Sequence, residues 1–91
     1  MSKLTIQNNA SASRFEMLVD GQLARLDYRL EDSTIYLLYV EVPDAAQGRG
    51  IASQLTEAAL KFARDEGRKV VPVCPFIATY VRRHPEMVAA D

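Results

Sequence analysis

The hydrophobic pattern of this chain changes its period once, near Pro43, and this change restricts the fold more than any other feature. Residues 34–42, "TIYLLYVEV", are apolar at nearly every position, which is typical of an extended strand in a sheet. From Ile51 to Ala63, apolar residues recur at the spacing of an amphipathic helix. The short apolar run "KVVPVC" at residues 69–74 then predicts a short buried strand. Strand, glycine-containing turn, helix and strand make one βαβ crossover, which requires a parallel pair and a right-handed connection.

Local signals refine these elements. The strand over residues 34–42 is predicted to be covered on both faces, because its apolar residues occupy both parities. The helix is predicted to carry a Glu57–Lys61 ion pair and to end at Gly67 in the left-handed conformation. A last short helix is expected over "ATYVRRH", residues 78–84, stopped by Pro85.

The first half of the chain predicts antiparallel strands. Apolar and polar residues alternate there, and the turn signals are "NASAS", Asp20-Gly21 and "EDS". The residues expected on inner strand faces are Leu4, Ile6, Phe15, Met17, Val19, Ala24, Leu26, Tyr28 and Leu30. The predicted fold class is therefore α/β (α+β): a mainly antiparallel sheet with one parallel βαβ crossover and a short C-terminal helix.

Composition excludes several function classes. The 91 residues predict one domain over residues 1–91, and a net charge of -1 gives no indication of a nucleic-acid or membrane partner. Cys74 is the single cysteine, so no internal disulfide can form and a reducing cytoplasm is the expected location. No secretory signal or long apolar run is present, and no cluster of residues has metal-ligand spacing, so no metal is expected.

Two glycines, Gly48 and Gly50 in "QGRGIA", lie in the turn between the predicted strand and the predicted helix. A helix N-terminus presents unpaired N–H groups and favours anions, and glycine allows close approach to the backbone. The alternative is a tight turn that binds nothing. A P-loop is excluded because no Gly-Lys-Ser/Thr run exists, and a dinucleotide fingerprint is excluded because the next strand ends without an acid.

The segment "VPDAAQGRGIASQL" resembles the acyl-CoA-binding motif of the GNAT N-acetyltransferase superfamily. In that motif, Arg or Gln is followed after two residues by Gly, one residue, and Gly or Ala, which here are Gln47, Gly50 and Ala52. The resemblance implies that backbone amides of the turn hold the pyrophosphate of acetyl-CoA. The residues implied in cofactor binding are Val42, Gln47, Gly48, Arg49, Gly50, Ile51 and Ala52.

Residues 41–86 are more closely similar to the small, single-domain members of the superfamily, the YjdJ-type N-acetyltransferase-domain proteins. The shared marks are Glu-Val-Pro before the glycine turn, "VVPxCPF" in the next strand, and a terminal "Tyr-x-Arg-Arg-His-Pro-Glu". One departure is that relatives often carry His-Thr where this chain has Tyr39-Val40, so no role of that histidine transfers here.

Four residues are candidates for the chemistry of acetyl transfer, which needs a base for the amine and an acid for the leaving thiolate. Glu41 is the one charged residue of an apolar strand, so an apolar setting is expected for it, and the resemblance implies a base there. The alternative is a residue that leans out at the sheet end. Tyr80 lies where the superfamily often has a tyrosine near the CoA sulfur, or it is a core aromatic. Cys74 is a buried structural thiol, or an acyl-accepting or redox-sensitive one. His84 is a base or proton shuttle, or a cap or surface residue.

The resemblance implies transfer of an acetyl group from acetyl-CoA to an amine. Larger superfamily members insert helices between the first strands to build the acceptor site, and "NASAS" leaves no room for them. The acceptor side is therefore expected to be open, which favours an amine on a protein or peptide. Arg82 and Arg83 either meet the CoA phosphates or form a solvated basic face. The alternative functions are a non-catalytic acyl-CoA-binding or protein-interaction module, and a structural domain with an empty turn.

Overall fold

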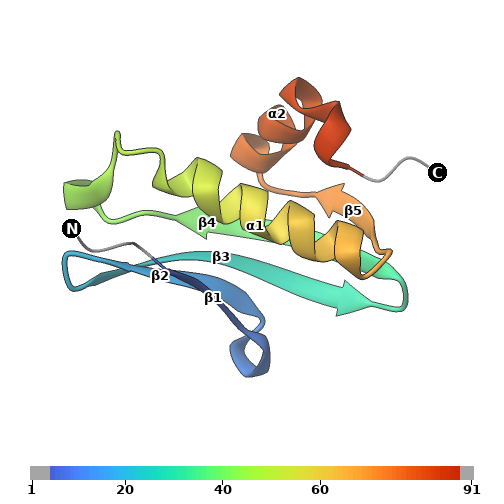
Figure 1. Ribbon diagram of the computed structural model, residues 1–91, viewed down its shortest axis with the longest axis horizontal. Helices are drawn as coiled ribbons and strands as arrows, with labels where there is room; N and C mark the ends of the chain where they lie inside the picture. Colours follow the sequence, from blue (N-terminus) through green and yellow to red (C-terminus); the bar gives the residue numbers. More distant parts are fainter. Residues whose placement is uncertain (1–4, 89–91) are drawn as a thin grey trace.

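The computed structural model describes residues 5–88, and its centre is a five-stranded sheet whose strands follow chain order (Figure 1). β1 to β4 form an antiparallel meander, and β5 lies parallel to β4. The strands are β1 (Ile6–Asn9), β2 (Arg14–Val19), β3 (Gln22–Glu31), β4 (Thr34–Glu41) and β5 (Lys69–Pro72). The helices are α1 (Ile51–Asp65) and α2 (Pro75–Arg83), with 3-10 turns η1 (Ala10–Ala12), η2 (Asp44–Ala46) and η3 (Pro85–Met87). The predicted α/β (α+β) fold class is confirmed.

Two of the tight turns have the backbone conformation that their residues predict. Asp20 and Gly21 both have positive φ, 53° and 79°, as a two-residue hairpin requires. Asp32, in the next turn, has φ of 54°. Because consecutive hairpins of a meander lie at opposite ends of a sheet, the Asp20-Gly21 turn lies beside the end of β4 and the Asp32 turn lies at the far end (Figure 1).

The core fills one face of the sheet, between the strands and α1. The predicted inner residues of β2 and β3 are buried, except that Leu30 at the end of β3 is 40% exposed, and Leu4 lies outside the described residues. The buried strand residues are Phe15, Met17, Val19, Ala24, Leu26, Tyr28, Ile35 and Leu37. Leu55 and Leu60 of α1 pack against them with no exposed surface, and each contributes about 1.5–3 kcal/mol through burial.

The prediction that β4 is covered on both faces is wrong. No part of residues 5–88 lies over the face opposite α1, where Tyr39 is 50% exposed. The tyrosines of this outer face instead pack against guanidinium groups of β3. Arg29 lies 4.7 Å from the ring centre of Tyr36, and Arg25 lies 5.9 Å from that of Tyr39. These cation–π pairs explain how apolar rings are accommodated on an open face.

The crossover helix α1 ends as predicted, but its ion pairing differs. Gly67 has φ of 68° and follows the last helical turn. Lys61 pairs with Asp65 at 2.9 Å, so the predicted Glu57–Lys61 pair is wrong. Both carboxylates stand four residues from Lys61 on the same helix, and Glu57 instead lies close enough to Tyr80 of α2 to influence its ionisation.

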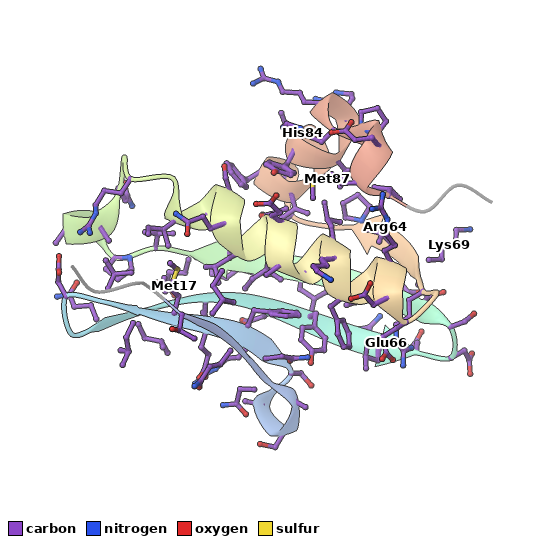
Figure 2. All side chains as sticks on the ribbon, viewed as in Figure 1. Met17, Arg64, Glu66, Lys69, His84 and Met87 are labelled. Atoms are coloured by element: carbon purple, nitrogen blue, oxygen red, sulfur yellow. The ribbon has the colours of Figure 1, made fainter. Side chains whose placement is uncertain are left out.

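The last elements close the sheet edge. β5 is half-buried rather than fully buried, because it is the edge strand of the sheet. The C-terminal helix is confirmed, but it begins at Pro75 rather than Ala78, since proline suits the first position of a helix. The segment after it crosses back over α1, where the Arg64 guanidinium donates a hydrogen bond to the backbone carbonyl of Glu86 (Figure 2).

Candidate functional site

The turn before α1 owes its two glycines to backbone conformation. Gly48 has φ of 82°, and Gly50, the N-cap of α1, has φ of 74°. A side chain at either position would meet no atom within 4 Å, so crowding does not explain the glycines. Left-handed backbone does explain them, because it costs other residues roughly 1–2 kcal/mol. The open space beside both residues leaves their backbone accessible from outside.

The turn before α1 carries a run of unpaired backbone amides. The amide nitrogens of residues 48–53 donate to no acceptor among residues 5–88. The next amide, that of Gln54, is the first to bond within the helix, to the carbonyl of Gly50 at 3.0 Å. Unpaired donors at a helix N-terminus coincide with the positive end of the helix dipole. An anionic group such as a phosphate is the natural acceptor for them.

A hollow of about 450 Å³ opens beside these amides. Its apolar wall comes from the end of β4, the start of α1 and the start of α2. The residues that line it are Val40, Val42, Ala46, Gln47, Gly48, Gly50, Ile51, Ala52, Ser53 and Phe76. The hollow thus combines hydrogen-bond donors at one side with an apolar surface at the other, which suits a ligand with a phosphate and an uncharged arm.

All but one of the predicted cofactor residues meet in this hollow. The exception is Arg49, whose guanidinium pairs with Asp20 at 2.9 Å and which does not line the hollow. Gln47 lines it, and its side-chain nitrogen donates to the carbonyl of Val42 at 3.2 Å. Gln47 therefore joins the turn to the end of the strand that precedes it.

Sequence reasoning missed four residues of the hollow, which are Val40, Ala46, Ser53 and Phe76. Phe76 is 42% exposed on the first turn of α2, and it stands two residues after Cys74 in the "CPF" segment. An exposed aromatic directly after a helix-starting proline was an available signal. Phe76 reaches the hollow because α2 lies beside the start of α1, and the sequence pattern does not specify how these two helices are placed.

A bulge in β4 decides which residues face the hollow. Tyr28 pairs with Leu37, but Asp27 pairs with Tyr39, so Leu38 is an extra residue in β4. The bulge reverses the alternation beyond it. Val40 then faces the same side as Leu37, and Tyr39 and Glu41 face the outer side of the sheet.

Glu41 consequently lies in polar, solvent-accessible surroundings, and the expected apolar setting is wrong. Its side chain is 52% exposed, and its Oε1 accepts a hydrogen bond from Nη1 of Arg25 at 2.7 Å. The residues on either side of it, Val40 and Val42, line the hollow, but Glu41 does not. The structure therefore separates this carboxylate from the hollow by the backbone of one strand.

Tyr80 and His84 lie together in a smaller hollow of about 180 Å³ between α1 and α2. Their rings are 4.3 Å apart, and the Tyr80 hydroxyl donates a weak hydrogen bond to the Met87 sulfur at 3.8 Å. Burial, with a smaller effect of nearby Glu57 and Glu86, raises the pKa of Tyr80 above its ordinary value of 10.0. Tyr80 thus stays a protonated phenol at neutral pH.

His84 caps the end of α2 and is half-exposed, with Nδ1 3.5 Å from a carboxylate oxygen of Glu86 (Figure 2). Ser53 and Phe76 line both hollows, so the two adjoin at the start of α1. Tyr80 and His84 are thereby brought together near, but not into, the larger hollow.

Cys74 is buried at the start of α2 and lines neither hollow. The amides of Val73 and Cys74 both donate to the carbonyl of Leu37, at 2.9 and 3.2 Å. This shared acceptor is the last link between β5 and β4, because the paired register ends at Leu37. Beyond it, the end of β4 has no strand partner on the β5 side among the described residues.

The two arginines at the end of α2 are exposed. Arg82 donates to the Thr79 hydroxyl at 3.4 Å, and Arg83 lines the smaller hollow. Among residues 5–88, no group of three or more His, Cys, Asp or Glu residues could hold a metal ion. Over the same residues, no helix has the length and apolar character needed to cross a membrane.

The five-stranded sheet with one parallel pair, followed by a glycine turn at the start of the crossover helix, has the architecture of the GCN5-related class. A family model described as GCN5-related N-acetyl-transferase matches residues 14–91, and the chain belongs to that family.

Individual relatives extend the comparison. The chain is 32% identical over 87 residues to Protein NATD1 of Xenopus tropicalis, covering 92% of this chain and 80% of that protein. Over 49 residues it is 47% identical to Protein NATD1 of Homo sapiens, covering 54% of this chain and 43% of that protein. The solution structure of a GCN5-like protein from Staphylococcus aureus matches with a TM-score of 0.75 at 24% identity, over 96% of this chain and 86% of that one. This last likeness supports the fold.

Proposed function

We propose that residues 1–91 form a single N-acetyltransferase domain that binds acetyl-CoA at the start of α1 and transfers its acetyl group to an amine. The observation that carries the proposal is the run of unpaired amides over residues 48–53 beside the larger hollow. The pyrophosphate of acetyl-CoA would accept hydrogen bonds from these amides. Its uncharged pantetheine arm would lie against Val40, Val42 and Phe76.

The transfer requires a neutral amine, whose nitrogen forms a bond to the acetyl carbon while the carbon–sulfur bond breaks. A base must take the proton of the ammonium, and an acid must supply a proton to the departing thiolate. Glu41 is the proposed base, because it is the one carboxylate of β4 and is open to solvent. Tyr80 is the proposed acid, because it carries a phenol proton at neutral pH and lines the smaller hollow, which adjoins the larger one. Cys74 is proposed to pack rather than react, since it is buried.

The acceptor is proposed to be an amine on a protein or peptide. The outer face of the sheet, where Glu41 and Tyr39 are exposed, is covered by no element of residues 5–88 that would enclose a small molecule. A polypeptide can cover an open surface of this kind, whereas a small amine would bury little of its own surface there.

A second candidate is a non-catalytic acyl-CoA-binding module. It is favoured by one specific observation: neither proposed catalytic group lines the hollow, since Glu41 is paired with Arg25 and the Tyr80 hydroxyl contacts Met87. In this case the amides and the apolar wall would still hold the cofactor, but no acetyl transfer would follow.

Calorimetry with acetyl-CoA, and with inorganic pyrophosphate as a competitor, tests the cofactor site. We expect binding that pyrophosphate weakens; absence of binding would leave a structural domain with an empty turn. A thiol-release assay over peptides and small amines then separates the two candidates. Release of CoA in the presence of an amine supports the enzyme, and binding without release supports the module.

A further inference from the structure

The ion pair between Arg49 and Asp20 joins the glycine turn to a hairpin far away in the sequence. Nη1 of Arg49 lies 2.9 Å from Oδ2 of Asp20, in the turn between β2 and β3. The meander places this hairpin and the end of β4 at the same end of the sheet (Figure 1). A residue 29 positions earlier in the chain is thereby brought to the side of the turn.

The other hydrogen bonds that residues 47–50 make within residues 5–88 are local. Gln47 bonds to Val42 and Asp44, and Gly50 accepts from Gln54. None reaches farther along the chain than Val42 or Gln54. Two left-handed glycines flank Arg49, and glycine has the largest freedom to lose on ordering. Ala46 and Ile51 anchor the two ends of the turn in the core, and between them the Arg49–Asp20 pair is the contact that joins residues 47–50 to a distant part of the sheet.

We propose that Asp20 is a positioning residue for the cofactor site: through Arg49 it holds the Gly48–Gly50 turn in the conformation that presents its amides to a pyrophosphate. This proposal rests on the proposed acetyl-CoA binding. Asp20 itself touches no part of the hollow. Its contribution is preorganisation, since a turn that is already ordered loses less freedom when the ligand binds.

The sign of the effect distinguishes positioning from ordinary electrostatics. Asp20 carries a negative charge near the proposed pyrophosphate site. Removing that charge relieves long-range repulsion, which by itself should strengthen the binding of acetyl-CoA. Loss of positioning should weaken it. An exposed ion pair of this kind contributes about two- to fivefold in an equilibrium constant. If Asp20→Asn binds acetyl-CoA more weakly, the loss of a repelling charge cannot be the cause, and the loss of positioning is.

Asp20→Asn removes the charge and keeps the turn, because Asn-Gly is a strongly favoured pair in such hairpins. A matched control exists in Asp32→Asn. Asp32 has nearly the same φ, 54° against 53°, but lies in the turn at the far end of the sheet. Both variants should melt within a few degrees of the wild type. Affinity for acetyl-CoA is measured by calorimetry for the wild type, the two variants, Arg49→Gln and the Asp20→Asn/Arg49→Gln double variant.

We expect Asp20→Asn to bind acetyl-CoA about two- to fivefold more weakly, Asp32→Asn to bind as the wild type does, and the double variant to bind no more weakly than Arg49→Gln alone. Equal or tighter binding by Asp20→Asn overturns the proposal. So does a double variant whose loss is the product of the two single losses, because the residues would then act separately.

An NMR measurement without ligand separates this proposal from the function on which it rests. If Asp20 orders the turn, the amide signals of Gly48 and Gly50 should shift in Asp20→Asn and stay unchanged in Asp32→Asn. Unchanged glycine signals in Asp20→Asn would show that Asp20 does not order the Gly48–Gly50 turn, which overturns the proposal. A wild-type protein that binds no acetyl-CoA overturns both the proposed function and the cofactor role of Asp20, even where the signals shift.

Discussion

Replacing Ala52 by glutamate puts a negative charge at the proposed anion site without straining the backbone. Ala52 lies in the first turn of α1 and lines the larger hollow. Gly50 is a poorer position for this test, because its φ of 74° disfavours any side chain. Glutamate in the first turn of a helix is favourable for the helix itself, by about 0.3–1 kcal/mol. Fold stability and cofactor binding should therefore move in opposite directions.

The loss of affinity follows from Coulomb's law. A carboxylate about 5 Å from a phosphate charge, at an effective dielectric constant of about 20, is repelled by roughly 3 kcal/mol. This corresponds to about a 100-fold weaker Kd for acetyl-CoA. The unfolding midpoint should rise by up to about 4–8 °C if the helix gains the full 1 kcal/mol. Calorimetry and thermal melting measure the two effects on the same protein sample.

Two controls isolate the charge at the hollow. Ala52→Gln has the same shape as the glutamate variant without its charge, so it should lose much less affinity. Gln54→Glu adds the same charge two residues later, where the side chain borders a different groove with Glu57 and Lys61. At about twice the distance and through water, its repulsion should be below about 0.5 kcal/mol. Wild-type affinity in Ala52→Glu, or an equal loss in Gln54→Glu, would refute the anion site.

Three further predictions concern the remaining residues. Glu41→Gln should keep acetyl-CoA affinity and lower turnover by roughly 10²-fold, as expected for loss of a base; a comparable loss in His84→Ala with none in Glu41→Gln would reverse the assignment. Because the pKa of Tyr80 is raised in the folded protein, its contribution to stability is complete below pH 10 and is lost as pH rises through the folded value. Denaturant unfolding above pH 10 should therefore show a shallower decline in Tyr80→Phe, and equal slopes would contradict the raised pKa. Gly50→Ala should destabilise the fold by about 1–2 kcal/mol, and Gly50→Asn by less, since Asn tolerates positive φ.

The parts of the fold that the sequence predicted correctly depend on short-range physics. Alternation and helical spacing gave the strands and the crossover helix, because each pattern reflects which side chains one element can bury. Asp20-Gly21 and Gly67 specified left-handed backbone, which only a few residues adopt at low cost. The glycine turn likewise follows from local conformation, so the position of the proposed anion site rests on a few residues of the sequence.

The surroundings of Glu41 were not predictable, because they depend on one inserted residue. Under strict alternation Glu41 would share the buried face with Ile35 and Leu37, and an apolar setting would follow. The bulge at Leu38 reverses this and directs Glu41 toward Arg25 of β3. A bulge has no compositional signature in an apolar run such as "TIYLLYVEV". Predicting that Glu41 pairs with Arg25, and Arg49 with Asp20, would have required the register of β2, β3 and β4.

The same bulge determines how an acceptor would reach the cofactor. Val40 and Val42 face the hollow, while Glu41 between them faces the opposite side of the sheet. On the proposed function, the thioester and the base would then lie on two sides of one strand, and they can meet only where β5 separates from β4 beyond Leu37. An amine must approach this opening from the outer face, because α1 and its core residues fill the inner one. Since no element of residues 5–88 covers the outer face, an acceptor would on the proposed function reach this opening across an exposed surface.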